Sequence, residues 1–314
     1  MFKNIFKHSD TPQFCRFFKS LKKSQRDTFY KNTNVHIFTE DIHLGIMPIG
    51  GKSKNRPDFS VNLTGDEQNK EKAIKLLNSV ASNNRLSANE LISDALDNIV
   101  KSLLYKGFSY YEITQDTSGF FQLGNFTSDR LANFLGLYFQ FVPKADRNMW
   151  NKKFVVKASN SIWKILIPKV LGSSSGYRQL ISGLANKADM YPKCFDIKDI
   201  TTRQDQFDFK EYSIQTKVYQ YRLLDLWGGT LRHSSTDYVN EYYLIHRIVR
   251  LNRAQAILRE HIVNEINDLF DRLKIKSQIE VSGLPTVEFI DNQLKKLEAG
   301  ELELSEITNS TSAF

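Results

Sequence analysis

The stretch Leu91–Ile113 reads LISDALDNIVKSLLYKGFSYYEI, and its pattern changes at Gly107. Before this glycine, apolar residues recur every three or four positions, which is the spacing of one helix face. Ser87 and Glu90 have the spacing of a capping box, in which two side chains satisfy the first free amides of a helix. Aromatic and β-branched residues typical of a strand follow Gly107, and Asp116–Gly119 can form a turn. The sequence therefore predicts a helix that ends at Gly107, followed by a β-hairpin.

The segments on either side of this stretch extend the pattern to a mixed α+β fold. Residues 33–64 are predicted to be extended segments and turns, because Val35, Ile37 and Leu44–Ile49 are typical of strands. Asp66 can cap a helix that runs to about Ala81. After the hairpin, further strands are predicted at Leu137–Val142, Phe154–Lys157 and Trp163–Ile167.

The longest periodic segment is Asp237–Lys276, which predicts one very long helix near the C-terminus. Its apolar stripe, expected to face a core, is formed by Leu244, Ile248, Leu251, Leu258, Ile262, Ile266 and Leu269. On the opposite side we expect His246, Arg250 and Arg253 to meet water, a neighbouring subunit or DNA, and a subunit contact is the preferred functional role because arginine forms directed pairs with carboxylates. A last helix is predicted at about Val287–Ala299.

The positive charge is concentrated at the N-terminus. The chain has 314 residues and a net charge of +8, of which residues 1–31 carry +6. Such a basic arm attracts nucleic acid, an anionic lipid surface or another acidic partner, or is simply solvated. The candidate contact residues are Lys3, Lys7, Lys19, Lys22 and Lys23. We expect removal of residues 1–31 to leave the folded body intact.

Motifs for catalysis and for metal binding are incomplete. Gly45–Ser53 resembles a phosphate-binding P-loop, but it has five residues where the motif needs four. The six histidines include no His-Glu-x-x-His pair, and the two cysteines, Cys15 and Cys194, are too few for a four-thiolate zinc site. No run is apolar and long enough to span a membrane. We therefore predict no enzymatic activity, no cofactor, no metal and no membrane partner.

The order of these features resembles the portal proteins of tailed bacteriophages. In that family a helix ends at a small residue and leads into a strand of the form G-x-(A/S)-x-x-E-I, which Gly107–Ile113 matches, and a hairpin turn follows. The resemblance extends in patches over about residues 35–307. Its further segments are Gln140–Pro143, Trp163–Pro168, Leu171–Gly172, Gly176–Arg178, Tyr242–Phe270, Gly283–Thr286 and Leu297–Ile307.

The resemblance implies a domain organisation. It divides the chain into a basic N-terminal arm (1–31), a mixed α/β wing-like domain (32–170), a stem- and clip-like segment (171–235), the long helix with the C-terminal helix (236–300) and a flexible tail (301–314). The implied fold class is α+β, with a wing domain, a helical stem and one very long helix.

The resemblance also implies a function. Portal subunits form a closed ring, typically twelve-fold, at one capsid vertex, and double-stranded DNA is packaged and ejected through it. The implied partners are further copies of the chain, double-stranded DNA, terminase, capsid and head–tail connector proteins, and the implied locations are the virion and, during assembly, the bacterial cytoplasm. The alternative is a non-enzymatic nucleic-acid-binding protein that uses the basic arm. An enzyme whose site is not evident in the sequence is a third class.

Overall fold

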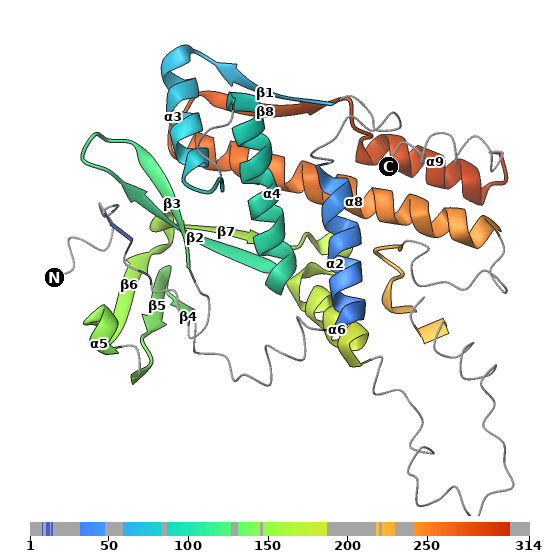
Figure 1. Ribbon diagram of the computed structural model, residues 1–314, viewed down its shortest axis with the longest axis horizontal. Coiled ribbons are helices and arrows are strands. Elements are labelled where there is room, and N and C mark those ends of the chain that lie inside the picture. Colours follow the sequence, from blue (N-terminus) through green and yellow to red (C-terminus); the bar gives the residue numbers. More distant parts are fainter. Residues whose placement is uncertain are drawn as a thin grey trace, which may run out of the picture.

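The computed structural model describes residues 8, 11–12, 14, 32–47, 59–82, 87–126, 131–144, 147–186, 218–219, 222–229 and 241–301 (Figure 1). Helices and strands are mixed along the chain, which confirms the α+β class. The helices are α2 (Thr33–Ile46), α3 (Glu67–Asn78), α4 (Ala88–Lys106), α5 (Arg147–Trp150), α6 (Ser173–Asn186), α8 (Glu241–Arg272) and α9 (Val287–Glu298). The strands are β1 (Ser60–Gly65), β2 (Phe108–Gln115), β3 (Phe121–Asn125), β4 (Leu131–Phe134), β5 (Leu137–Phe141), β6 (Phe154–Ala158), β7 (Ile162–Leu166) and β8 (Ser277–Ser282).

The helix and hairpin predicted around Gly107 are confirmed. The Ser87 amide donates to Glu90 Oε2 at 3.0 Å, and the Glu90 amide donates to Ser87 Oγ at 3.4 Å, which completes the capping box. Gly107 has a φ of +77°, the left-handed conformation that ends a helix most easily at glycine. Strand β2 then pairs with β3, with Ile113 opposite Leu123.

Three small antiparallel sheets organise the strands. Their orders are β3-β2-β7, β4-β5-β6 and β1-β8. The last sheet joins distant parts of the chain, because Ser60 and Ser282, which are 222 positions apart, face each other and their hydroxyls lie 2.8 Å apart. Strand β8, which the sequence did not predict, therefore connects the segment that follows α8 to β1 near the N-terminal end of the chain.

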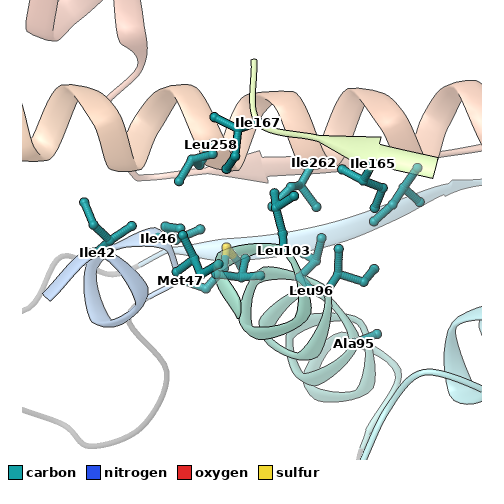
Figure 2. Packing of buried hydrophobic residues seen from close by; sticks show 14 of the residues in the cluster. Ile42, Ile46, Met47, Ala95, Leu96, Leu103, Ile165, Ile167, Leu258 and Ile262 are labelled. Atoms are coloured by element: carbon teal, nitrogen blue, oxygen red, sulfur yellow. The ribbon is translucent and has the colours of Figure 1, made fainter. Parts of the chain in front are cut away.

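The main hydrophobic core lies between α2, α4, α8 and β7. Figure 2 shows Ile42 from α2, Leu96 and Leu103 from α4, Ile165 from β7 and Leu258 from α8 around one interior. Side chains of residues 32–170 and of residues 236–300 are buried in this same cluster. These two parts of the chain therefore share one core.

Helix α2 corrects the sequence-based expectation of extended structure over residues 33–46, whereas β1 confirms it from Ser60 onward and residues 48–58 lie outside the described ranges. Asn32 caps the helix by accepting the amide of Asn34 at 3.0 Å. The buried residues Val35, Phe38 and Ile42 have helical spacing along one face, which packs into the main core. Burial against α4 and α8 outweighs the preference of β-branched residues for strands.

Helix α8 ends at Arg272, four residues before the predicted end at Lys276, whereas the predicted start at Asp237 lies outside the described residues. Its buried surface is wider than one stripe. Leu251, Leu258, Ile262, Ile266 and Leu269 are buried as expected. Leu244 and Ile248 are only half-buried. Instead, Ile245 and Val249 are buried, because they pack against Ile290 and Leu297 of α9 on a second side of the helix.

A second hydrophobic cluster lies beneath the sheet β4-β5-β6. It contains Phe14, whose ring stacks on Phe126 with 4.5 Å between ring centroids. The Phe14 amide donates to Oε2 of the buried Glu112 at 2.8 Å. Removal of residues 1–31 therefore removes a core side chain, which revises the expectation that this segment is dispensable for folding.

Candidate functional site

The three basic residues predicted on α8 are already paired within the chain. Arg250 makes two contacts with Asp225, an ion pair with its carboxylate and a hydrogen bond of 2.8 Å from Nη1 to its carbonyl oxygen. The pairs connect α8 to α9 and to the 222–229 segment: His246 with Glu298 at 3.1 Å, Arg250 with Asp225, and Arg253 with Asp291. Each pair connects two elements of the same chain, so any contact that these basic side chains make with another protein would compete with these carboxylates.

The second set of predicted contact residues is the group of lysines in the basic N-terminal arm. Lys3, Lys7, Lys19, Lys22 and Lys23 all fall outside the described residues. The tail 302–314 and both cysteines, Cys15 and Cys194, also fall outside them.

A pocket of about 280 Å³ opens between α2, α4 and α6. Its floor is apolar, and two histidines, a glutamate, a lysine and a tyrosine surround it. The lining residues are Val35, His36, Thr39, Glu40, His43, Lys101, Leu104, Tyr105 and Ile181. The pocket is therefore large enough for a small ligand with both apolar and polar groups, although the sequence alone did not predict it.

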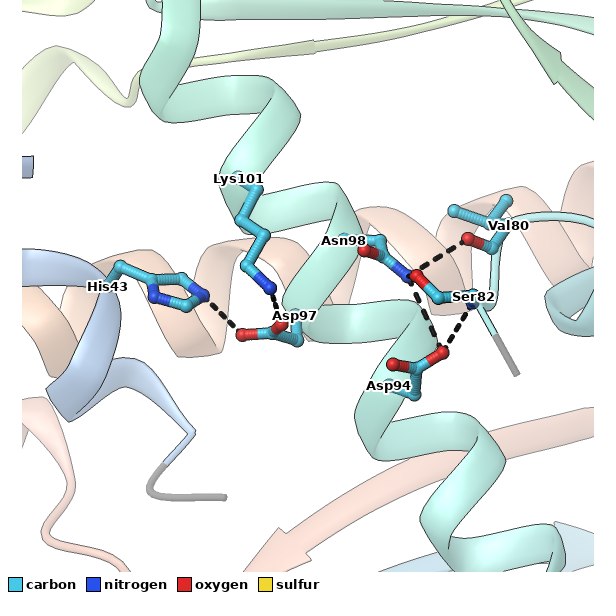
Figure 3. A network of polar contacts seen from close by, with 7 residues as sticks. All are labelled: His43, Val80, Ser82, Asp94, Asp97, Asn98 and Lys101. Atoms are coloured by element: carbon cyan, nitrogen blue, oxygen red, sulfur yellow. Dashed lines mark hydrogen bonds and ion pairs between the residues drawn. The ribbon is translucent and has the colours of Figure 1, made fainter. Parts of the chain in front are cut away.

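A carboxylate on α4 connects two of the residues that line this pocket. Asp97 accepts a hydrogen bond from Nε2 of His43 and pairs with Lys101 Nζ at 2.6 Å (Figure 3). Burial alone would raise the pKa of Asp97, but the hydrogen bonds from His43 and Lys101 outweigh it and lower this pKa below its ordinary value. Asp97 is therefore held ionised, and it orients the side chains of His43 and Lys101.

The next turn of α4 makes a second polar network, also drawn in Figure 3. Asp94 accepts the amide of Ser82, and Asn98 Nδ2 donates to the Val80 carbonyl at 3.2 Å. These bonds satisfy the Ser82 amide and the Val80 carbonyl, which follow α3, and they connect the end of α3 to α4. Their role is structural, since each partner belongs to a turn between two packed helices.

The polar groups that line the pocket can be compared with the requirements of nucleophilic catalysis. A His–Asp pair can orient an imidazole as a general base, but the base also needs an aligned nucleophile. The Thr39 hydroxyl donates to backbone carbonyls, at 2.9 Å to Val35 and 3.0 Å to His36, and is not aligned with His43. Within the described part of the chain, no group of three or more His, Cys, Asp or Glu residues could hold a metal ion.

The P-loop-like stretch is not a phosphate loop at its first glycine. Gly45 lies inside helix α2, where a Cβ atom would come within 2.1 Å of the side chain of Gln255. Gln255 donates to the carbonyl oxygen of Asp41 at 2.9 Å. Gly45 therefore lets α8 approach α2 closely, while residues 48–58 fall outside the described ranges.

Sequence reasoning also missed an apolar sheet surface, here called the apolar face. It is the side of β4-β5-β6 opposite the second cluster, formed by Ala132, Phe134, Leu137, Phe139, Phe141, Phe154, Val156 and Ala158. Phe134, Phe141 and Phe154 are 67%, 53% and 57% exposed. Leu137, Phe139 and Phe141 are alternate residues of one strand and therefore share one face of the sheet. This spacing could have revealed the apolar face, because the face of a sheet that meets water usually carries polar residues.

Comparisons with known proteins do not assign the chain to a family. No protein-family model matches it, and no curated protein gives a significant match. Among the helices that the structure describes, none has the length and apolar character needed to cross a membrane.

Proposed function

We propose that this protein is a portal-like structural subunit of a phage or prophage. In this proposal, identical copies form a closed ring, twelve-fold as is typical of portals, at one capsid vertex. Double-stranded DNA passes through the ring during packaging and ejection, while terminase, capsid and head–tail connector proteins bind to it. The observation that carries the proposal is the order of helices and strands along the chain.

Three segments that carry the resemblance have the element types that the portal order requires. Helix α4 ends at the left-handed Gly107, and the strand containing Glu112 and Ile113 follows in a hairpin. Tyr242–Phe270 lies within the long helix α8. After Gly283, Thr286 caps α9 by accepting the amide of Phe289 at 3.2 Å. This order supports the proposal, although each element by itself occurs in many folds.

The acidic residue of the strand motif has a structural role, which fits a scaffold better than an enzyme. Glu112 is 1% exposed and accepts the Phe14 amide. Burial lowers the pKa of Lys157, and the charge of Glu112 opposes this shift. The motif thus joins the central hairpin to the second cluster instead of presenting a carboxylate to a substrate.

The test is the mass and shape of the native particle. Native mass spectrometry and negative-stain imaging of purified protein should show a closed ring many times heavier than the 36.3 kDa subunit. Portals can need a scaffold or shell to assemble, so the measurement covers high protein concentrations and several salt concentrations. Only monomers and dimers under all these conditions would contradict the proposal.

The alternative, a nucleic-acid-binding protein that uses the basic arm, is favoured by the charge of +6 in residues 1–31. Because Phe14 belongs to the second cluster, the arm is best tested without deletion. Changing Lys3, Lys7, Lys19, Lys22 and Lys23 together to glutamine should weaken non-specific DNA binding and flatten its dependence on salt by about one unit of slope per lost phosphate contact. An unchanged slope would exclude these lysines as the DNA contact.

A further inference from the structure

The apolar face is large enough to bind a segment of protein chain. Its three exposed phenylalanines present about 350 Å² of ring surface to solvent, on the scale at which aromatic side chains bury 150–250 Å². This is within the range of the largest apolar patch on a typical monomer. It is less than half of the roughly 800 Å² that each partner contributes to a standard protein interface. The area fits a short peptide segment better than a whole protein surface.

The surroundings of the apolar face are basic. Lys152 and Lys153 directly precede Phe154 on β6, and Lys144 and Arg147 follow β5. Residues 131–158 contain five lysines and arginines and one acidic residue, Asp146, which lies outside the described residues. The occupant that this surface favours therefore combines aliphatic side chains with negative charge.

One segment of this chain has that composition. Residues 301–307 read ELELSEI, with Leu302, Leu304 and Ile307 interleaved with Glu301, Glu303 and Glu306. Residues 301–314 contain no lysine or arginine. The segment follows α9 directly, so its starting point in the fold is known.

The start of this segment is too far from the apolar face of its own subunit. The end of α9 lies near the start of α8, because Glu298 pairs with His246. The other end of α8 lies near the second cluster, because Arg272 donates to the carbonyl oxygen of Ile162 at 3.3 Å. The helix rise between His246 and Arg272 amounts to about 40 Å, and six extended residues reach only about 20 Å. Figure 1 shows β4, β5 and β6 on the opposite side of the view from α9.

We propose that the segment 301–307 of one subunit binds the apolar face of a neighbouring subunit. Its leucines cover Phe141 and Phe154, and its glutamates pair with Lys144, Lys152 and Lys153. The contact is heterologous, since two different surfaces meet, and such contacts close into rings when the rotation allows it. The inference rests on the proposed ring and names one of its subunit contacts.

Cross-linking of the full chain locates the segment. Subunits of natural isotopic composition are mixed with subunits labelled with heavy nitrogen, brought to assembly, and treated with a zero-length carbodiimide reagent. The reagent activates a glutamate carboxylate, and a nearby lysine amine displaces the activating group to form an amide. Peptides that join Glu303 or Glu306 to Lys152 or Lys153 are expected, half of them between light and heavy chains. Cross-links confined to chains of one isotopic composition would overturn the inference.

Charge reversal tests the energetics. The change of Lys152 and Lys153 to glutamate should weaken association about tenfold, as expected for two solvent-exposed ion pairs. Adding Glu303→Lys with Glu306→Lys should restore it. The matched control reverses Lys295 and Lys296, two exposed lysines of α9, and should leave association unchanged. Loss of association in the control to the same extent, or no rescue by the charge swap, would overturn the inference.

A second pair of variants tests the apolar contact. Phe141→Ser should weaken assembly without unfolding the subunit, whereas Phe289→Ser, at a 49% exposed residue of α9, should not. If the unchanged protein forms rings and Phe141→Ser forms them equally well, this inference fails while the proposed function stands. If the unchanged protein stays monomeric under all conditions, the ring and the contact fail together.

Discussion

Arg259 in α8 donates a hydrogen bond of 3.2 Å to the carbonyl oxygen of Ile46, the last residue of α2. The same guanidinium also bonds to the carbonyl oxygen of Pro285, just ahead of α9. One buried side chain thus satisfies backbone groups of two segments that are more than 200 positions apart in the sequence. Burial lowers the pKa of Arg259 to about 10, and the charge of Glu260 opposes the shift.

Arg259→Met should destabilise the protein by about 1–3 kcal/mol for each buried carbonyl left without a donor. The free energy of unfolding in urea, followed by circular dichroism, is the measurement. Arg222→Met, at an exposed arginine, is the control and should change it little. Equal stability of the two variants would show that water replaces the guanidinium at both carbonyls.

Asp97→Asn should destabilise the protein at neutral pH by about 1.5–3 kcal/mol, the usual range for hydrogen bonds to a charged group. Because the pKa of Asp97 is lowered by folding, its contribution is complete above the pKa of the unfolded chain, about 4, and is lost as the pH falls through the folded pKa. Urea unfolding of both proteins over a series of pH values below 7 checks this, and the stability difference should begin to shrink below about pH 4. A difference that stays constant as the pH falls well below 4 would contradict the role of the ionised carboxylate.

Leu258→Ala should cost about 2–5 kcal/mol, because Leu258 is fully buried at the centre of the main core. Leu244→Ala should cost less, since Leu244 is only half-buried near the start of α8. Thermal and urea unfolding of both variants measures the difference. Similar losses would contradict this prediction and would mean that α8 is packed as tightly at its start as at its centre.

Arg253→Glu should destabilise the docking of α9 on α8, because it places a second negative charge beside Asp291. The charge swap, Arg253→Glu with Asp291→Arg, should restore most of the lost stability. Hydrogen exchange of α9 amides reports the docking, and the mass of the native particle reports assembly. Poor assembly with unchanged exchange would instead assign Arg253 to a subunit contact.

Phe14→Ala should cost about 3–5 kcal/mol, since Phe14 is 3% exposed and stacks on Phe126. The effect should concentrate in β5 and β6, where hydrogen exchange should become faster. Phe289→Ala, at a 49% exposed phenylalanine of α9, serves as the matched control and should leave exchange in these strands unchanged. No change for Phe14→Ala would return residues 1–31 to the status of a dispensable arm.

Local interactions made several elements predictable. The capping box of Ser87 and Glu90, the stop at Gly107 and the turn at Asp116–Gly119 all act within a few residues, so the sequence predicted α4 and its hairpin correctly. The predicted strands β5, β6 and β7 and the last helix, α9, are also present. The candidate pocket was not predictable, because His43 and Asp97 come together only when α2 packs on α4.

What the sequence determined by itself was therefore the set of elements whose caps, turns and periodicity are local, together with the α+β class. Tertiary structure alone decided that residues 33–46 form a helix, that β8 pairs with β1, and that α8 is covered on a second side by α9. The physical reason is the distance between partners in the chain. The side chains of Gln255 and Arg259 bond to α2 from more than 200 positions away in the sequence. Local sequence patterns cannot predict such bonds, because these residues meet only in the folded protein.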